Sequence, residues 1–384
     1  MRPPRLTLRR AAIGLAILAV VGAGGGFIVA WSGLYNIAAS SGHIRAVERF
    51  LRFGLTQSVD LRAPNGSPDL EDPDLIRLGA GHFYAGCAYC HGAPGTPISP
   101  VAAAMLPAPP SLVGARAAWT AGELFWIVKH GIKYTGMPAW PAASRDDEVW
   151  AMVAFLWALP GLDAVAYRRL AMGGVEIAPS SGRELALASS VTDAVGACAR
   201  CHGAEDRPPP SARVPRLQGQ PAEMLRAALE AYAAGTRHSG IMQLAVSGLS
   251  TADLRHLADY YARLPSPAPA EASAGQEAGA STAAGRHLAA EGRAVAGIPP
   301  CLSCHGPDAS PLYPRLAGQS SAYLAAQLHA WKRGDKGSTA LNAIMAPIAE
   351  RLTPDDIAAV STYFATLDPA GETGQRDAKT GRPQ

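Results

Sequence analysis

The chain has 384 residues, enough for two or three domains of ordinary size. Hydrophobic residues make up 48% of it, so the chain can bury real cores and is not disordered as a whole. The 34 basic residues nearly balance the 31 acidic ones, and the net charge of +3 shows no footprint of nucleic-acid binding.

The N-terminal region combines basic residues with a long apolar run. Several arginines up to Arg10 precede an uncharged stretch from Ala11 to Trp31. About 21 helical residues span roughly 30 Å, the thickness of one hydrocarbon core. Basic residues before the span predict a cytoplasmic N-terminus, with everything after the span in the bacterial periplasm. The alternative is a cleaved signal peptide, although the small residues near Ala38 make a poor cleavage site.

Composition divides the remainder into connections and domains. The segment 265–285 contains only Pro, Ala, Ser, Gly, Thr, Glu and Gln, so it has little to bury and is expected to be a flexible linker spanning about 25 Å. The expected organisation is an N-terminal flank and anchor at 1–31, a juxtamembrane connection at 32–70, domains at 71–170, 176–264 and 286–367, and a disordered tail at 368–384.

Helix signals fill the first domain. A helix is expected from Asp74 to Tyr84, and Thr120 with Glu123 forms a capping box that opens a second helix. Ser144 and Asp147 are expected to open a third helix. Its predicted apolar face consists of Val149, Met152, Val153, Leu156 and Trp157.

The second and third domains form an internal repeat. Pro-Arg-Leu-x-Gly-Gln occurs at 215–220 and again at 314–319. Met242 and Met345 follow, and each unit closes with a capped helix, expected at 254–261 and 357–364. The shared order and spacing predict that the two units have the same fold.

Three pairs of cysteines carry the chemistry of the chain. Each pair is spaced C-x-x-C, and a histidine follows at once: His91, His202 and His305. C-x-x-C-H is the attachment signature of c-type haem. The two thiols form thioether bonds to the haem vinyl groups, and the adjacent imidazole becomes the proximal iron ligand. The residues expected to bind haem covalently are Cys87, Cys90, Cys198, Cys201, Cys301 and Cys304.

Other interpretations explain these cysteines less well. Structural zinc would pair two C-x-x-C units or add two further histidines to one unit, and three units do not pair off. A thioredoxin-like motif would account for one pair beside a βαβ pattern. Disulfides would not require the histidines. The sequence therefore predicts three covalently bound haems.

The ligand on the far face of each iron determines what the haem can do. A methionine there raises the potential and closes the iron, whereas an open face permits oxygen or peroxide chemistry. Met137, Met242 and Met345 are the expected axial ligands, and Met105 is the rival in the first domain. Lone histidines in suitable regions are weaker candidates, namely His130, His238 and His329.

These motifs resemble membrane-anchored, multihaem class I cytochromes c. Residues 180–367 resemble two-haem, high-potential periplasmic cytochromes c, and residues 71–165 resemble single class I domains through the string from Phe125 to Trp140. The resemblance implies an all-α fold: three class I cytochrome c domains in tandem after an N-terminal transmembrane helix. It also implies that a proline carbonyl accepts the proximal His N–H and that a leucine two residues later packs on the ring. The matching pocket residues are Pro110, Pro215, Pro314, Leu112, Leu217 and Leu316.

The resemblance implies outer-sphere electron transfer, with no bond made or broken by the protein. The expected setting is a single-pass protein of the bacterial inner membrane whose haem domains face the periplasm. There it would carry electrons between a dehydrogenase or quinol-oxidising complex and a downstream acceptor. The expected partners are a periplasmic dehydrogenase, an oxidase or a soluble cytochrome, with the membrane bound through the N-terminal helix and no nucleic acid. The alternatives are a peroxidase-like enzyme with one open haem, and a haem-based sensor. A long linker would weaken exchange between the second and third haems unless their domains dock.

Overall fold

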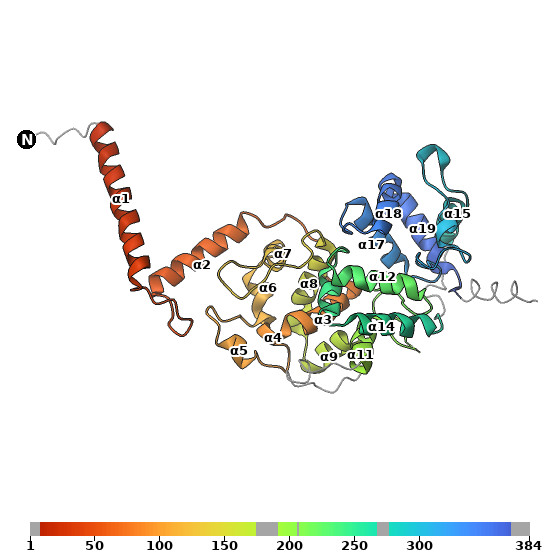
Figure 1. Ribbon diagram of the computed structural model, residues 1–384, viewed down its shortest axis with the longest axis horizontal. Coiled ribbons are helices and arrows are strands. Elements are labelled where there is room, and N and C mark those ends of the chain that lie inside the picture. The colour runs from red at the N-terminus through yellow and green to blue at the C-terminus, as the bar shows by residue number, and fades with distance from the viewer. Residues whose placement is uncertain (1–7, 174–190, 206, 267–275, 370–384) are drawn as a thin grey trace, which may run out of the picture.

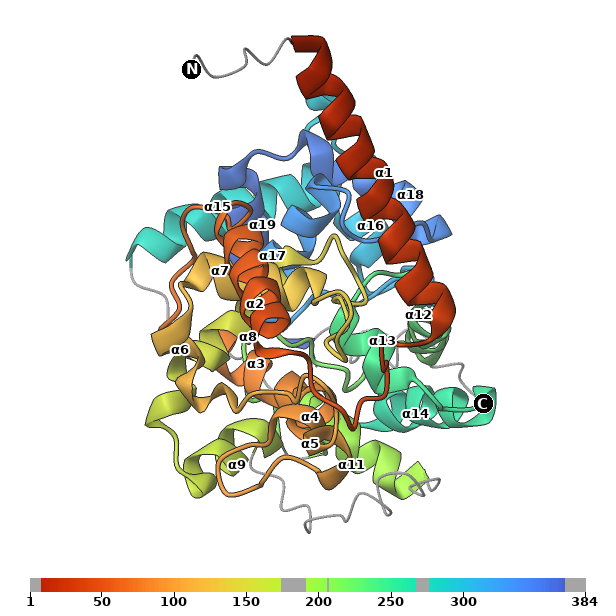
Figure 2. The same ribbon diagram turned by 90° about the vertical axis from the view of Figure 1, so that its left-hand side faces the viewer.

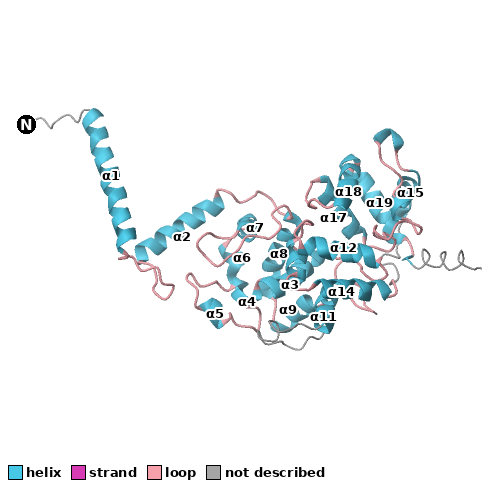
Figure 3. Cartoon of the chain, viewed as in Figure 1, coloured by secondary structure: helices cyan, strands magenta, loops and turns pink. Residues whose placement is uncertain are grey.

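The computed structural model describes residues 8–173, 191–205, 207–266 and 276–369. Regular structure in these ranges is helical, apart from isolated β-bridges (Figures 1 and 3). The longer helices are α1 (Leu8–Ser32), α2 (Arg45–Asp60), α3 (Pro73–Gly86), α7 (Ala121–His130), α8 (Asp146–Ala158), α9 (Ala164–Met172), α11 (Val191–His202), α12 (Ala222–Ala233), α14 (Thr251–Arg263), α15 (Gln276–Glu291), α17 (Ser321–Lys332), α18 (Ala340–Arg351) and α19 (Pro354–Thr366). The shorter ones are α4 (Ala88–His91), α5 (Pro100–Ala103), α6 (Ala115–Ala118), α13 (Gly240–Val246), α16 (Leu302–His305) and the 3₁₀ turns Leu112–Gly114, Leu159–Gly161 and Ala294–Ala296.

Helix α1 extends away from the helical units that follow, and α2 leads from it to them (Figure 1). In Figure 2, which is turned by 90°, both helices lie in front of these units. α1 is long and apolar enough to cross a membrane, and none of that span is buried within the molecule. An anchor and a signal sequence both fit this description. α2 places Val47, Phe50 and Leu51 in solvent, and its far end packs on the first unit through the buried Val59.

The first helical unit, which contains α3 to α9, is built on the crossing of α3 and α8. A Cβ at Gly79 would lie 2.1 Å from the carbonyl oxygen of Ala151, so the two backbones touch at a point where no larger residue fits. Phe83 and Phe155 fill the interior with ring centroids 4.9 Å apart. The apolar face predicted for the third helix is buried at Val149, Met152, Val153 and Leu156, while Trp157 is half-buried.

The second unit (α11 to α14) and the third unit (α15 to α19) share a contact between the repeated motif and the closing helix. Gly219 N–H donates to the Tyr261 carbonyl at 3.0 Å, and Gly318 N–H donates to the Phe364 carbonyl at 2.9 Å. In both units, therefore, the Gly of the repeated motif is held by the closing helix. The predicted capping box of Thr120 and Glu123 is present. The two closing helices, predicted only to be capped, also begin with capping boxes, formed by Ser250 with Asp253 and by Thr353 with Asp356.

Two expected boundaries differ in the structure. α15 begins at Gln276, so the second half of the expected linker is helical, and Gly285 lets this helix contact the backbone of α19 at Ala359. Ala, Gln and Glu favour helix once a packing surface is available. The third helix of the first unit begins at Asp146 rather than at Ser144. The Ser144 hydroxyl instead bonds His238 Nδ1 and the Asp335 carbonyl.

The second and third units dock through their repeated motifs. The Gln319 side chain accepts from Arg216 N–H at 3.0 Å and donates to the Arg216 carbonyl at 2.7 Å. Gln220 makes the same pair of bonds to Arg315, at 2.9 and 2.8 Å. This reciprocal exchange fixes the two units against each other, so their separation does not depend on the length of the linker.

The first unit docks on the second by a different set of contacts. Asp72 pairs with Arg213 at 2.6 Å, and Asp74 accepts from the Ala212 N–H at 3.0 Å. Arg200 donates to the carbonyls of Gly81 and Ala171 at 2.9 and 3.3 Å. The three units therefore pack directly against one another and are not independent domains joined only by linkers.

Replacing both Gln220 and Gln319 by alanine removes four hydrogen bonds between the second and third units. Each substitution leaves a buried backbone N–H and a buried carbonyl without their partner. We therefore expect each one to lower the stability of the docked arrangement by roughly 1–3 kcal/mol. Small-angle scattering should show a larger radius of gyration for the haem-loaded double variant, and thermal unfolding should split into two stages. Substituting the exposed Gln57 in the same way should change neither readout. An unaltered scattering profile in the double variant would contradict this account of docking.

Candidate haem-binding sites

Each C-x-x-C-H motif is folded as one helical turn. The motifs occupy α4, the end of α11 and α16, and the helical spacing places both thiols and the imidazole on the same turn. All six cysteines lie in the described part of the chain, and none of them pairs with another in a disulfide. Burial raises the pKa of the Cys87, Cys198 and Cys301 thiols, which shows that these three sulfurs lie in apolar surroundings.

The proximal histidines all make the same hydrogen bond. The distance from Nδ1 to the carbonyl oxygen is 2.8 Å for His91 and Pro110, 3.0 Å for His202 and Pro215, and 2.9 Å for His305 and Pro314. A carbonyl accepts only, so Nδ1 carries the proton and Nε2 keeps its lone pair for a metal. Burial lowers the pKa of His202 and His305, which favours the neutral imidazole that ligates iron.

The surroundings of these histidines fit a haem. A cavity of about 180 Å³ lies beside His91, and Leu112 lines it. Leu217 and Cys198 both pack against the core of the second unit, and Leu316 and Cys301 both pack against the core of the third. The two thiols, the free Nε2 and the apolar wall together form the donor set and pocket that covalent haem attachment requires. Within the described ranges, no group of three His, Cys, Asp or Glu side chains is arranged to hold a bare metal ion.

The methionines lie on different elements in the three units. Met137 lies in a tight loop in which its N–H bonds the Thr135 hydroxyl at 3.0 Å. Its rival Met105 lies directly against this loop, because a Cβ at Gly136 would clash with the Met105 methyl group. Both first-unit candidates thus share one region, and the geometry leaves the choice between them open. Met242 lies in the first turn of α13, and Met345 lies within α18.

The histidines weighed as rival ligands have other surroundings. His238 contacts Ser144 through Nδ1, and its backbone N–H donates to the Lys336 carbonyl. His130 stacks with Trp126 on α7 at a centroid distance of 5.1 Å. The buried His82 packs against Trp140, and burial lowers its pKa to about 4.

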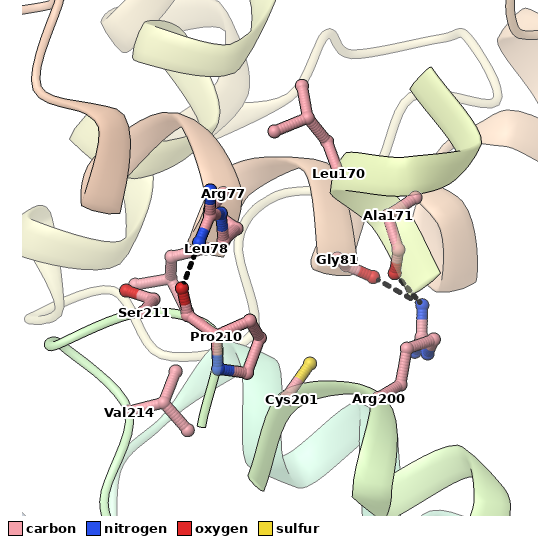
Figure 4. A pocket seen from close by; sticks show the side chains of 10 residues that line it. All are labelled: Arg77, Leu78, Gly81, Leu170, Ala171, Arg200, Cys201, Pro210, Ser211 and Val214. Carbon is pink, nitrogen blue, oxygen red and sulfur yellow. Dashed lines mark hydrogen bonds between the residues drawn. The ribbon is translucent and has the colours of Figure 1, made fainter. Parts of the chain in front are cut away.

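The attachment sites of the first two units meet at the boundary between the units. Figure 4 shows Arg200 directed at the carbonyls of Gly81 and Ala171, and Arg77 bonded to the Pro210 carbonyl. The Cys201 sulfur faces the same part of α3, since a Cβ at Gly81 would lie 3.2 Å from it. α3 then leads directly into Cys87, so a single helix connects the two sites.

Sequence patterns did not reveal the groups that join the units. Gln220 and Gln319 end the repeated motif, and the repetition was a signal that could have been interpreted as an interface. Glu148 gave no such signal, because its partners Ser239 and Gly240 lie about 90 residues away in the chain. Burial raises the pKa of Glu148, while the neighbouring Arg145 and the Ser239 hydroxyl act in the opposite direction.

Comparison with known families agrees with this geometry. Residues 74–156 match the family described as cytochrome c oxidase, cbb3-type, subunit III. Residues 289–368 match the family described as cytochrome c. These two matches lie on the first and third units and include their C-x-x-C-H turns.

Relatives in other bacteria match a longer part of the chain. A thiosulfate dehydrogenase electron acceptor from Thiomonas intermedia is 38% identical over 186 residues, covering 47% of this chain and 83% of the relative. A second, from Stutzerimonas stutzeri, is 34% identical over 227 residues, covering 58% of this chain and all of the relative. The chain belongs to the multihaem class I cytochromes c. The family matches and the cysteine motifs support covalently bound haem c, and the relatives support electron transfer as the role of this cytochrome.

Solved structures of related proteins match about half of this chain. Cytochrome c4 of Acidithiobacillus ferrooxidans is 30% identical, with a TM-score of 0.39, over 44% of this chain and 98% of its own. A thiosulfate dehydrogenase from Marichromatium purpuratum is 32% identical, with a TM-score of 0.41, over 51% of this chain and 41% of its own.

The substitution His305→Ala tests the proximal assignment. We expect it to disrupt the haem site of the third unit while the other two sites keep their spectra, because each imidazole lies in a separate unit. Visible and magnetic circular dichroism spectra of the purified protein report this directly. His287→Ala, on the exposed surface of the same unit, serves as the control. Three unchanged haem signals in the His305 variant would contradict the assignment.

Proposed function

We propose that this protein is a membrane-anchored, three-haem electron carrier that takes electrons from a periplasmic dehydrogenase acting on thiosulfate and passes them to a downstream acceptor. The observation that carries the proposal is the threefold recurrence of one site. In each unit, a C-x-x-C-H turn places the histidine Nδ1 against a proline carbonyl. The named relatives are electron acceptors of thiosulfate dehydrogenase, which favours a donor of that class.

The protein's own residues bind and orient the haems. The six cysteines anchor them, and His91, His202 and His305 hold the proximal positions. Haem iron supplies reversible one-electron chemistry. The hydrogen bonds to Pro110, Pro215 and Pro314 fix each imidazole in one tautomer and one orientation, which increases its basicity as a ligand.

We assign the far ligands to Met137, Met242 and Met345. A thioether in this position raises the potential of a c-type haem and closes the iron to external ligands. Each of these methionines is half-buried, on a segment that its own unit folds between the haem motif and the closing helix. If these thioethers bind the irons, they would leave no open position for peroxide chemistry, and the haems would supply electron transfer alone.

The arrangement of the units supports a relay. The contacts at Gly81 and Cys201 join the first and second sites, and the exchange between Gln220 and Gln319 joins the second and third. Because these contacts are made by folded elements, the spacing between sites is fixed rather than averaged over a linker. Electrons entering at one end of the assembly can then leave at the other.

The location follows from the first two helices. We assign α1 as a single span of the bacterial inner membrane, with the haem units in the periplasm. α2 exposes Val47, Phe50 and Leu51 on one side and carries Arg45, Arg49 and Arg52 on the other. This amphipathic pattern suits a helix lying at the membrane surface. The anchor would hold the carrier beside membrane complexes and raise its effective concentration there.

Reconstituted electron transfer tests the proposal. The oxidised, haem-loaded protein is mixed with a catalytic thiosulfate dehydrogenase and thiosulfate, and haem reduction is followed by absorbance. We expect fast reduction that saturates with the concentration of this protein, and slow reduction when either the enzyme or thiosulfate is omitted. If the haems accept electrons from ascorbate but not from the enzyme with thiosulfate, then the proposed donor class is wrong.

A further inference from the structure

A buried carboxylate of the first unit lies at the boundary with the second. Glu148, on α8, is 3% exposed. Within its own unit, it pairs with Arg145 at 3.0 Å and accepts from Trp140 Nε1 at 3.2 Å. The remaining hydrogen bonds of the Glu148 carboxylate all cross to the second unit.

Those bonds end on the first turn of α13. Glu148 accepts from the Ser239 hydroxyl, from Gly240 N–H at 2.7 Å and from Ile241 N–H at 3.3 Å. The Ser239 hydroxyl in turn accepts from Met242 N–H at 3.1 Å. One carboxylate from the first unit therefore satisfies the donors that begin the helix carrying Met242.

Further contacts hold the same segment from the first unit. Arg145 donates to the His238 carbonyl at 2.9 Å, just before Ser239. A Cβ at Gly240 would lie 2.3 Å from Trp140 Nε1, so the indole closes directly over this residue. Ile241 packs against the apolar core of the first unit. Residues 238–241 of the second unit are thus held in place by polar and apolar contacts from the first unit.

We propose that Glu148 is a positioning residue for the axial ligand of the second haem, so that closure of this iron depends on the contact that Glu148 makes from the first unit. The inference rests on the proposed ligation by Met242. α13 has only seven residues and its first turn is held by Glu148, so it has little stability of its own. Loss of Glu148 frees the turn that places the Met242 sulfur.

Other docking contacts provide a matched control. Arg213 pairs with Asp72 at 2.6 Å across the same unit boundary and makes no hydrogen bond or ion pair to residues 238–242. A substitution there weakens docking without touching the ligand segment. If Glu148 served docking alone, Arg213→Gln and Glu148→Ala would therefore have the same effect on the second haem.

The test compares full-length, haem-loaded variants by the rate of cyanide binding to ferric haem and by amide hydrogen exchange in residues 240–246. Glu148→Ala should speed cyanide binding at one haem of the three by about tenfold or more and speed exchange in α13. Glu148→Gln should have a smaller effect, because the amide oxygen still accepts from backbone N–H groups. Arg213→Gln should leave both rates near those of the unaltered protein.

The substitution Met242→Ala separates the two proposals. If it opens one haem to cyanide and lowers the potential of that haem while Glu148→Ala and Glu148→Gln do not, the role of Glu148 is overturned and the ligation stands. If Met242→Ala leaves cyanide binding and potential unchanged, Met242 is not the ligand and both proposals fail. Should Glu148→Ala not fold, Ser239→Ala removes two bonds of the same network, those to Glu148 and to Met242 N–H, and must speed cyanide binding at the same haem, or the inference fails.

Discussion

The hydrogen bond from the proximal histidine to a proline carbonyl is the constraint on which the sites of this protein depend. An imidazole can offer only one nitrogen to iron, and the other must be satisfied inside an apolar pocket. In all three units a proline supplies that acceptor at 2.8–3.0 Å, on a loop that leads to a leucine of the pocket wall or core. Histidine, proline and leucine therefore act together, which explains why they recur at matching positions.

The contacts between units fix the three haem-binding sites relative to one another. Gln220 and Gln319 exchange bonds symmetrically between the second and third units, whereas the first unit approaches the second through ion pairs, backbone carbonyls and Glu148. The symmetric contact follows from the internal repeat, because the same motif faces itself. The asymmetric contact places the first unit against both the Cys201 attachment site and the Met242 helix. The second unit is thus held by the first unit through one set of contacts and by the third unit through another.

Local chemistry made much of this predictable from sequence. The C-x-x-C-H turns, the capping box at Thr120, the two capped closing helices and the buried face of α8 each depend on residues close together in the chain, and the structure has all of them. The boundary of α15 was missed because its composition resembles a linker, and only packing against α19 makes it helical. Ser144 resembled a helix cap, but its hydroxyl bonds groups in the two other units. The role of Glu148 could not be predicted from the sequence, because the hydrogen-bond donors that it binds come near it only in the folded protein.

The central claim is that three haems are covalently attached to one chain. Mass spectrometry of the denatured protein, purified from the membranes of a host that matures c-type cytochromes, tests it most directly. The account predicts a mass equal to the polypeptide plus three haems, with haem-bearing peptides that contain Cys87, Cys198 and Cys301. A chain that retains fewer than three haems after full maturation would contradict it.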